Sequence, residues 1–198
     1  MKKLSIAVIL SIILVCSSLS YGKANDGVVW EKSDYGIFGG NIKELKIDRQ
    51  NPDTVYVVAT GLYKTTDGGE NWDCLNQNTN SLKLSDLVVD PNQANVIYAV
   101  IDARLQRSGD GGQSWQLRHT GLVGSFRKLA INPVNSEILF ATTSSGVFKS
   151  ADAGLNWQAI NQSEQNIYHI SINPQDTNIL YASGIGGGVY RSTDEGLT

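Results

Sequence analysis

The sequence predicts an all-β protein in which a four-stranded antiparallel sheet is repeated about four times, the architecture of a β-propeller. One segment recurs with its aspartates 43, 42 and 42 residues apart, at Asp67, Asp110, Asp152 and Asp194. Each repeat contains four short β-rich runs separated by Gly, Asn, Asp and Pro. No ten-residue stretch after residue 22 has helical periodicity. Four-stranded units of about 40 to 45 residues are typical of propeller blades.

Residues 1–22 are expected to be a secretory signal peptide. Met1-Lys2-Lys3 precedes an apolar run from Leu4 to Leu19, and small residues follow. This run is short for the roughly 20 residues that span a bilayer, so we expect cleavage rather than a retained membrane anchor. Lipidation of Cys16 is disfavoured because the bulky Val15 precedes it. The mature chain is then expected to be exported, periplasmic or extracellular, with no membrane span.

Residues 23–198 are expected to form the propeller domain. Its blades are predicted at about residues 41–80, 81–124, 125–166 and 167–198. Alternating apolar and polar residues predict four strands in the first unit: Ile42–Ile47, Thr54–Ala59, Gly61–Thr65 and Asn71–Leu75. The turn after the first strand of each unit begins with Asp or Asn, at Asp48, Asp90, Asn132 and Asn173.

The recurring segment is predicted to be the hairpin between the third and fourth strands of each unit. Its aspartate accepts hydrogen bonds from nearby main-chain N–H groups, as in an Asx turn. The glycine two residues later supplies a positive φ, and the following tryptophan packs over the turn. An active site is not usually repeated once per blade, so we interpret these residues as structural. They are Asp67, Gly69, Trp72, Asp110, Gly112, Trp115, Asp152, Gly154, Trp157, Asp194 and Gly196.

The segments 65–72, 108–115 and 150–157 fit the pattern Ser/Thr-x-Asp-x-Gly-x-x-Trp, and a fourth copy begins at Ser192. This pattern resembles the Asp-box, or bacterial neuraminidase repeat (BNR). The resemblance covers residues 41–198 and implies a propeller like those of sialidases, sortilin-type receptors, xyloglucanases and the photosystem II assembly factor. In these families the boxes are structural and lie away from the binding face. The resemblance therefore implies an architecture without fixing a chemistry.

The ends of the domain indicate how the last blade is completed. Trp30 lies 42 residues before Trp72, so residues 28–33 match the outer strand that follows a hairpin. Thr198 falls one position before the fourth expected Trp, and we expect residues 28–33 to complete the last blade and leave no open edge. Because Asp-box propellers usually have more than four blades, we favour part of a larger ring over a closed ring of four blades. Two half-rings joined in a dimer are a third interpretation, which nothing in the sequence supports. A ring with missing blades is expected to self-associate through its open edges.

The first strand of each blade lines the channel of a propeller, and loops that enter it form the usual binding face. The four units differ at two neighbouring positions near the start of this strand. The polar side chains there form a candidate binding rim: Glu44, Asp86, Lys128, His169, Lys43, Arg127 and Tyr168. The alternative is a solvated rim whose ion pairs have little energetic consequence.

Composition excludes several classes of function. The 198 residues include 16 basic and 19 acidic side chains, for a net charge of −3, so no strong positive field points to nucleic acid. Cys74 is the only cysteine after residue 22, and no Cys/His spacing predicts a metal site. No metal and no cofactor are expected.

We expect a non-catalytic propeller that binds or scaffolds another protein or a surface glycan. The alternative is a fragment of a glycoside hydrolase, sialidase-like or xyloglucanase-like. The sialidase resemblance implies that three arginines bind the carboxylate of one substrate, but only Arg127 lies at the start of an inner strand. It also implies a Phe/Tyr-Arg-Ile-Pro segment ahead of the boxes, which the sequence does not have. A xyloglucanase-like mechanism needs two carboxylates that flank a glycosidic bond, for which Glu44 and Asp86 are the candidates.

Overall fold

The computed structural model describes residues 31–37, 41–75, 84–161, 167–185 and 188–197. Residues 34–198 form one compact unit, separate from residues 1–33. The predicted signal peptide, residues 1–22, lies outside the described residues. The description below concerns residues 34–198.

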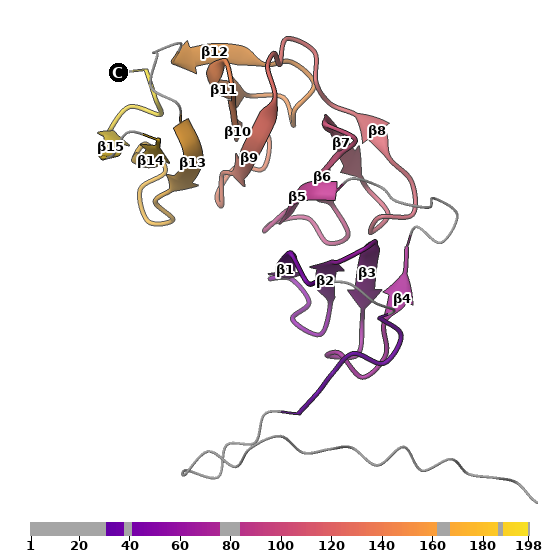
Figure 1. Ribbon diagram of the computed structural model, residues 1–198. Helices are drawn as coiled ribbons and strands as arrows, with labels where there is room; N and C mark the ends of the chain where they lie inside the picture. The colour runs from indigo at the N-terminus through magenta and orange to yellow at the C-terminus, as the bar shows by residue number, and fades with distance from the viewer. Residues whose placement is uncertain (1–30, 38–40, 76–83, 162–166, 186–187, 198) are drawn as a thin grey trace, which may run out of the picture. The chain divides into compact units, whose positions relative to one another are not determined.

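Four antiparallel sheets follow one another along the chain (Figure 1). The first sheet contains β1 (Glu44–Ile47), β2 (Val55–Val58), β3 (Leu62–Thr65) and β4 (Asp73–Cys74). The second sheet contains β5 (Leu84–Val89), β6 (Ile97–Ile101), β7 (Arg104–Ser108) and β8 (Gln116–Leu117). The third sheet contains β9 (Phe126–Ile131), β10 (Leu139–Thr143), β11 (Gly146–Ser150) and β12 (Gln158–Asn161). The fourth sheet contains β13 (Ile167–Ile172), β14 (Leu180–Gly184) and β15 (Val189–Ser192).

The predicted fold class is confirmed. Within each sheet, every strand pairs antiparallel with the next strand in the chain, so each sheet is a simple meander. The first strands of successive sheets lie against one another, with β5 between β1 and β9, and β9 between β5 and β13. The strands of the first sheet are one to three residues shorter at their ends than the sequence predicted. No helix occurs among the described residues, and therefore none that is long and apolar enough to cross a membrane.

Apolar side chains fill the space between neighbouring sheets. Tyr56 of the first sheet and Leu87 of the second are completely buried in the cluster that joins these two sheets. Leu139 and Trp157 belong to the cluster between the second and third sheets, and Phe140 belongs to the next one. Leu139 and Phe140 are adjacent in β10 and pack toward opposite neighbouring sheets. Successive side chains of a strand point to opposite faces of its sheet, so residues two apart face the same neighbour.

The predicted completion of the last blade by residues 28–33 stays a prediction. Residues 28–30 lie outside the described residues, and Glu31, Lys32 and Ser33 are not in a strand. Within the described part of the chain, the fourth sheet has three strands.

Candidate binding site on the inner strands

The recurring hairpins hold themselves together by local hydrogen bonds. In the second sheet, the Ser108 hydroxyl donates to Asp110 Oδ1 over 2.7 Å and accepts the N–H of Gly112 over 2.7 Å. Asp110 Oδ1 also accepts the N–H groups of Gln113 and Ser114, over 3.0 and 2.9 Å. Gly112 has a φ of 98°, a region that side-chain-bearing residues rarely adopt. The same hydroxyl-to-carboxylate and N–H-to-hydroxyl bonds recur in the other three hairpins.

These hydrogen bonds lower the pKa of the hairpin carboxyls. The main effect on Asp67 is the N–H of Asn71, and on Asp110 it is the hydroxyl of Ser114. The pKa of Asp152 is lowered in the same way, first by the N–H of Asn156. Because a carboxylate that accepts several N–H bonds is held ionised, these groups are poorly suited to donate a proton in catalysis.

The hairpin tryptophan links neighbouring sheets where its ring is buried. The indole N–H of Trp157 lies 2.9 Å from the carbonyl oxygen of Gly154 and 3.1 Å from that of Arg118. Gly154 belongs to the same hairpin, whereas Arg118 follows β8 of the preceding sheet. The ring therefore joins two sheets as well as covering its own turn.

Three of the seven candidate rim residues meet on the inner strands. The Lys128 ammonium on β9 lies 2.6 Å from Asp86 Oδ1 on β5 and 3.1 Å from Glu44 Oε1 on β1. Lys46, which the rim prediction did not include, lies 2.9 Å from the same Glu44 oxygen. We call these four residues the charge cluster.

The two carboxylates of the charge cluster also bind the main chain of the next sheet. Glu44 Oε2 accepts the N–H of Leu87 over 3.0 Å, and Asp86 Oδ2 accepts the N–H of Leu129 over 2.7 Å. Each acid thus connects its own sheet to the following one. The side chain of Asp86 is 1% exposed, so protein groups and not water satisfy its hydrogen-bonding oxygens.

Burial and charge act in opposite directions on the pKa values of this cluster. Burial alone favours the neutral form of Lys128, but hydrogen bonding to Asp86 and the charges of both acids raise the pKa of Lys128 above its ordinary value. Burial likewise opposes ionisation of Glu44, yet Lys46 and Lys128 hold the pKa of Glu44 below its ordinary value. Burial raises the pKa of Asp86, against the influence of Lys128. The opposite charges therefore outweigh the cost of burial for Glu44 and Lys128, whereas for Asp86 the cost of burial prevails.

The other four predicted rim residues are not part of the charge cluster. The Arg127 guanidinium lies 3.9 Å from the ring centre of Tyr168 and donates to the carbonyl oxygen of Ile167 over 2.7 Å. The main-chain N–H of Lys43 donates to Val58. His169 is exposed on β13, and among the described residues no hydrogen bond or ion pair joins it to the other six.

A cavity of about 470 Å³, the inner cavity, opens where the inner strands end and their Asp/Asn turns begin. All four sheets contribute to it. Its cations are Lys46, Arg49 and Lys128, and three prolines from equivalent turn positions lie at its edge: Pro91, Pro133 and Pro174. Aliphatic side chains such as Ile47, Val89 and Ile131 complete the lining. Lys46 and Lys128 are paired with Glu44 and Asp86, so the cavity combines the charge of Arg49 with an apolar surface.

Of the seven predicted rim residues, Lys128 alone lines this cavity. The predicted rim residues lie near the start of each inner strand. Most residues that line the inner cavity come from the end of the strand and the turn after it. The residues that sequence reasoning missed are Lys46, Arg49 and the three turn prolines. The Asp/Asn turns recur regularly in the sequence, but this recurrence predicts only connections between strands.

No protein-family model matches the sequence, and no curated protein matches it. Solved structures do resemble the chain. An ancestral GH74 enzyme superimposes with a TM-score of 0.63 and 24% identity, over 84% of this chain and 24% of that one. The GH74 xyloglucanase from Xanthomonas campestris gives a TM-score of 0.66 and 16% identity, over 84% of this chain and 31% of that one.

YCF48 from Cyanidioschyzon merolae gives a TM-score of 0.57 and 18% identity, over 81% of this chain and 58% of that one. A structure of YCF48 bound to D1 peptide gives a TM-score of 0.53 and 21% identity, over 79% and 54%. This chain therefore spans less than a third of the GH74 enzymes and slightly more than half of YCF48. All these proteins are β-propellers, and at such identities the likeness shows the shared fold alone.

Proposed function

We propose that this chain is an exported, non-catalytic β-propeller that binds or scaffolds another protein or a surface glycan through its inner cavity. Support for export comes from the sequence, in the basic, apolar and small-residue order of residues 1–22. Support for binding comes from the inner cavity, where cations and apolar side chains from four sheets converge.

The observation that carries this proposal is the engagement of both candidate catalytic carboxylates. Glu44 and Asp86 each contact the Lys128 ammonium and also accept a main-chain N–H from the next sheet. A retaining or inverting glycosidase needs one acid free to protonate the leaving group and one carboxylate free to attack or to activate water. Carboxylates held by a lysine and by the main chain are in a structural role instead.

The composition of the inner cavity favours a protein segment as the ligand. Lys46 and Lys128 are balanced by Glu44 and Asp86, so Arg49 is the lining cation that attracts a carboxylate. The proline rings and aliphatic side chains give apolar contact for the rest of a peptide. The structural likeness to YCF48, which has been solved bound to D1 peptide, agrees with a peptide ligand. Because Arg49 gives the inner cavity a positive charge, we expect the bound segment to be acidic.

The test is a calorimetric titration with a hexaglutamate peptide and, separately, with a xyloglucan oligosaccharide. We expect the peptide to bind and Arg49→Glu to weaken it at least about tenfold, because a lining cation is reversed. Arg104→Glu is the matched control: Arg104 is an exposed cation on β7 that does not line the inner cavity. Absence of binding by both probes, or equal loss in both variants, would contradict a ligand site in the inner cavity.

The structural likeness to GH74 enzymes supports one alternative function, in which the chain is a fragment of a glycoside hydrolase. It predicts release of sugar from xyloglucan, or of the fluorophore from a fluorogenic sialoside. If such hydrolysis occurs and is lost in Glu44→Gln and in Asp86→Asn, the chain is an enzyme and the proposal is wrong. We expect no hydrolysis by the unaltered chain.

A further inference from the structure

The two acids of the charge cluster lie in different surroundings. The side chain of Asp86 is 1% exposed and faces one ammonium group, that of Lys128 at 2.6 Å. The side chain of Glu44 is 16% exposed and faces two ammonium groups, those of Lys128 at 3.1 Å and Lys46 at 2.9 Å. Burial favours the neutral form of a carboxyl group, and a nearby cation favours the ionised form. Asp86 is therefore the acid that is more readily neutralised.

The strands β1, β6 and β9 pack against β5, the strand that carries Asp86. β1 brings the negative charge of Glu44, and β9 brings the positive charge of Lys128. β6 has no charged residue, and Arg127, the other cation of β9, stacks on an aromatic ring of β13. Burial, and after it the charge of Glu44, raises the pKa of Asp86 in spite of Lys128. The pKa of Glu44 is lowered instead, because its two ammonium partners outweigh its burial, so we expect a falling pH to protonate Asp86 first.

Protonation of Asp86 weakens its hold on Lys128. Asp86 Oδ2 accepts the N–H of Leu129 over 2.7 Å, so the proton is expected on Oδ1, the oxygen that faces the ammonium. A neutral carboxyl group no longer balances the ammonium charge, and Glu44 then has two ammonium groups for one negative charge. Lys128 lines the inner cavity and its side chain is 29% exposed, so its charge becomes available to a ligand there.

We propose that protonation of Asp86 switches the inner cavity from weak to tight binding of an anionic ligand. With Asp86 ionised, Arg49 is the lining cation that has no carboxylate partner among the described residues. With Asp86 neutral, the charge of Lys128 adds to that of Arg49. The ligand, an acidic protein segment, is then held more tightly in mildly acidic than in neutral solution. This inference rests on the proposed function, since it concerns the same ligand and the same cavity.

Binding and protonation are thermodynamically linked in this arrangement. If a proton on Asp86 strengthens the binding of an anion, the bound anion raises the pKa of Asp86 by the same coupling free energy. Binding at a pH just above the pKa of Asp86 in the free chain must therefore take up a proton from the solvent. The heat of binding then depends on the ionisation enthalpy of the buffer, and this measurement needs no variant.

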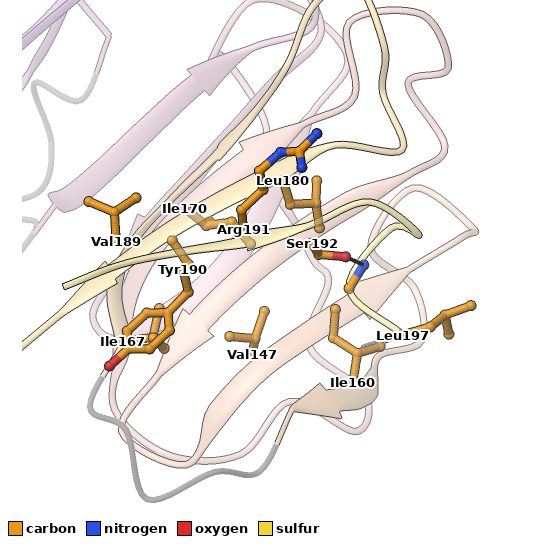
Figure 2. A pocket seen from close by; sticks show the side chains of 12 residues that line it. Val147, Ile160, Ile167, Ile170, Leu180, Val189, Tyr190, Arg191, Ser192 and Leu197 are labelled. Carbon is orange, nitrogen blue, oxygen red and sulfur yellow. Dashed lines mark hydrogen bonds between the residues drawn. The ribbon is translucent and has the colours of Figure 1, made fainter.

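A second cavity, of about 540 Å³, lacks such a switch. Figure 2 shows Arg191 there together with aliphatic side chains such as Val147 and Leu180. Among the described residues that line this cavity, Arg191 is the charged one and there is no carboxylate. Its charge is therefore constant between neutral and mildly acidic pH, and Arg191→Gln is a control for binding at that place.

The test is a calorimetric titration of a hexapeptide of cysteic acid, acetylated and amidated, into the folded chain at about pH 7.5 and at about pH 4. The sulfonates stay ionised at both pH values, so that the protein alone changes its charge. We expect binding to be at least about fivefold tighter at the lower pH, the effect of one further unit charge close to the ligand. Arg191→Gln should keep this difference. At about pH 5, the heat of binding should vary between buffers in the direction of proton uptake.

Two variants test the switch itself. Asp86→Asn imitates the protonated acid at every pH, so at about pH 7.5 it should bind at least about fivefold more tightly than the unaltered chain. Its affinity should change less than about twofold at about pH 4, and both histidines are still present, so a constant affinity excludes them as the cause. Lys128→Met removes the charge that protonation releases, and should bind weakly at both pH values.

The outcomes separate the switch from the binding site. Equal affinity of the unaltered chain at both pH values would overturn the switch and leave the inner cavity as a ligand site. A pH dependence of undiminished size in Asp86→Asn or in Lys128→Met would do the same. No binding at either pH, or binding that is lost in Arg191→Gln, would overturn the proposed function together with the switch.

Discussion

The hairpins and the inner strands of the same four sheets differ in how strictly they repeat. Every hairpin uses a hydroxyl, an aspartate and a glycine in the same hydrogen bonds. The inner strands carry Glu44, Asp86, Lys128 and His169 at one equivalent position. A hairpin closes its hydrogen bonds within itself, so each copy must have the same residues. An inner side chain contacts another sheet, so its chemistry can vary as long as its partner varies with it.

The largest effect is expected from the hairpin tryptophan. Trp157→Ala should lower the free energy of unfolding by about 3–5 kcal/mol, because it empties a buried site between two sheets. Denaturant unfolding followed by circular dichroism measures this. Trp157→Phe keeps an aromatic ring but loses the hydrogen bonds to Gly154 and Arg118, and should cost less. A loss below about 1 kcal/mol for the alanine variant would show that the hairpins do not hold the sheets together.

The charge cluster should give the next largest effect. Asp86→Ala leaves the N–H of Leu129 without its acceptor and the Lys128 ammonium with Glu44 alone, and we expect a loss of about 3 kcal/mol. The double variant Asp86→Ala/Lys128→Met also removes the half-buried ammonium that Asp86 no longer balances, and should recover part of that loss. Denaturant unfolding of the unaltered chain, Asp86→Ala, Lys128→Met and the double variant gives the coupling energy. A double variant less stable than the single one would contradict the pairing.

The hairpin hydroxyl should matter less than either. Ser108 is completely buried and accepts the N–H of Gly112, so Ser108→Ala should cost about 1–2 kcal/mol. Ser108→Thr is the control, because Thr65 makes the same bonds in the first hairpin. Thermal unfolding compares the two. Equal losses would mean that steric fit, and not the hydroxyl, decides stability at this position.

The smallest effect is the pH dependence of the hairpins. Folding lowers the pKa of Asp67, Asp110 and Asp152, so their contribution is fully present above the ordinary carboxyl pKa of about 4. It is lost as the pH falls below that value toward the lowered pKa of the folded state. Denaturant midpoints measured from pH 6 to pH 2 should fall, and Asp110→Asn should make the fall less steep. An unchanged slope would exclude the hairpin carboxylates as its cause.

Much of the fold was predictable because its signals are local and repeated. Hydroxyl, Asp, Gly and Trp at fixed spacing define a hairpin, and alternating apolar residues define the strands beside it. The pairing of Glu44, Asp86 and Lys128 was predicted only as a shared position, since the sequence does not give their distances. Lys46 and Arg49 were missed because their part in the inner cavity depends on how four sheets are packed. Residues far apart in the chain meet there without a local pattern to mark them.

The most direct test of the account is a calorimetric titration of the hexaglutamate peptide into three proteins, all under conditions in which they are folded. Under the proposed function, the hairpins stabilise the fold and the inner cavity binds the ligand. Ser108→Ala should therefore bind the peptide as the unaltered chain does, within about twofold, while Arg49→Glu should bind at least about tenfold more weakly. Normal binding by Arg49→Glu together with weakened binding by folded Ser108→Ala would contradict it.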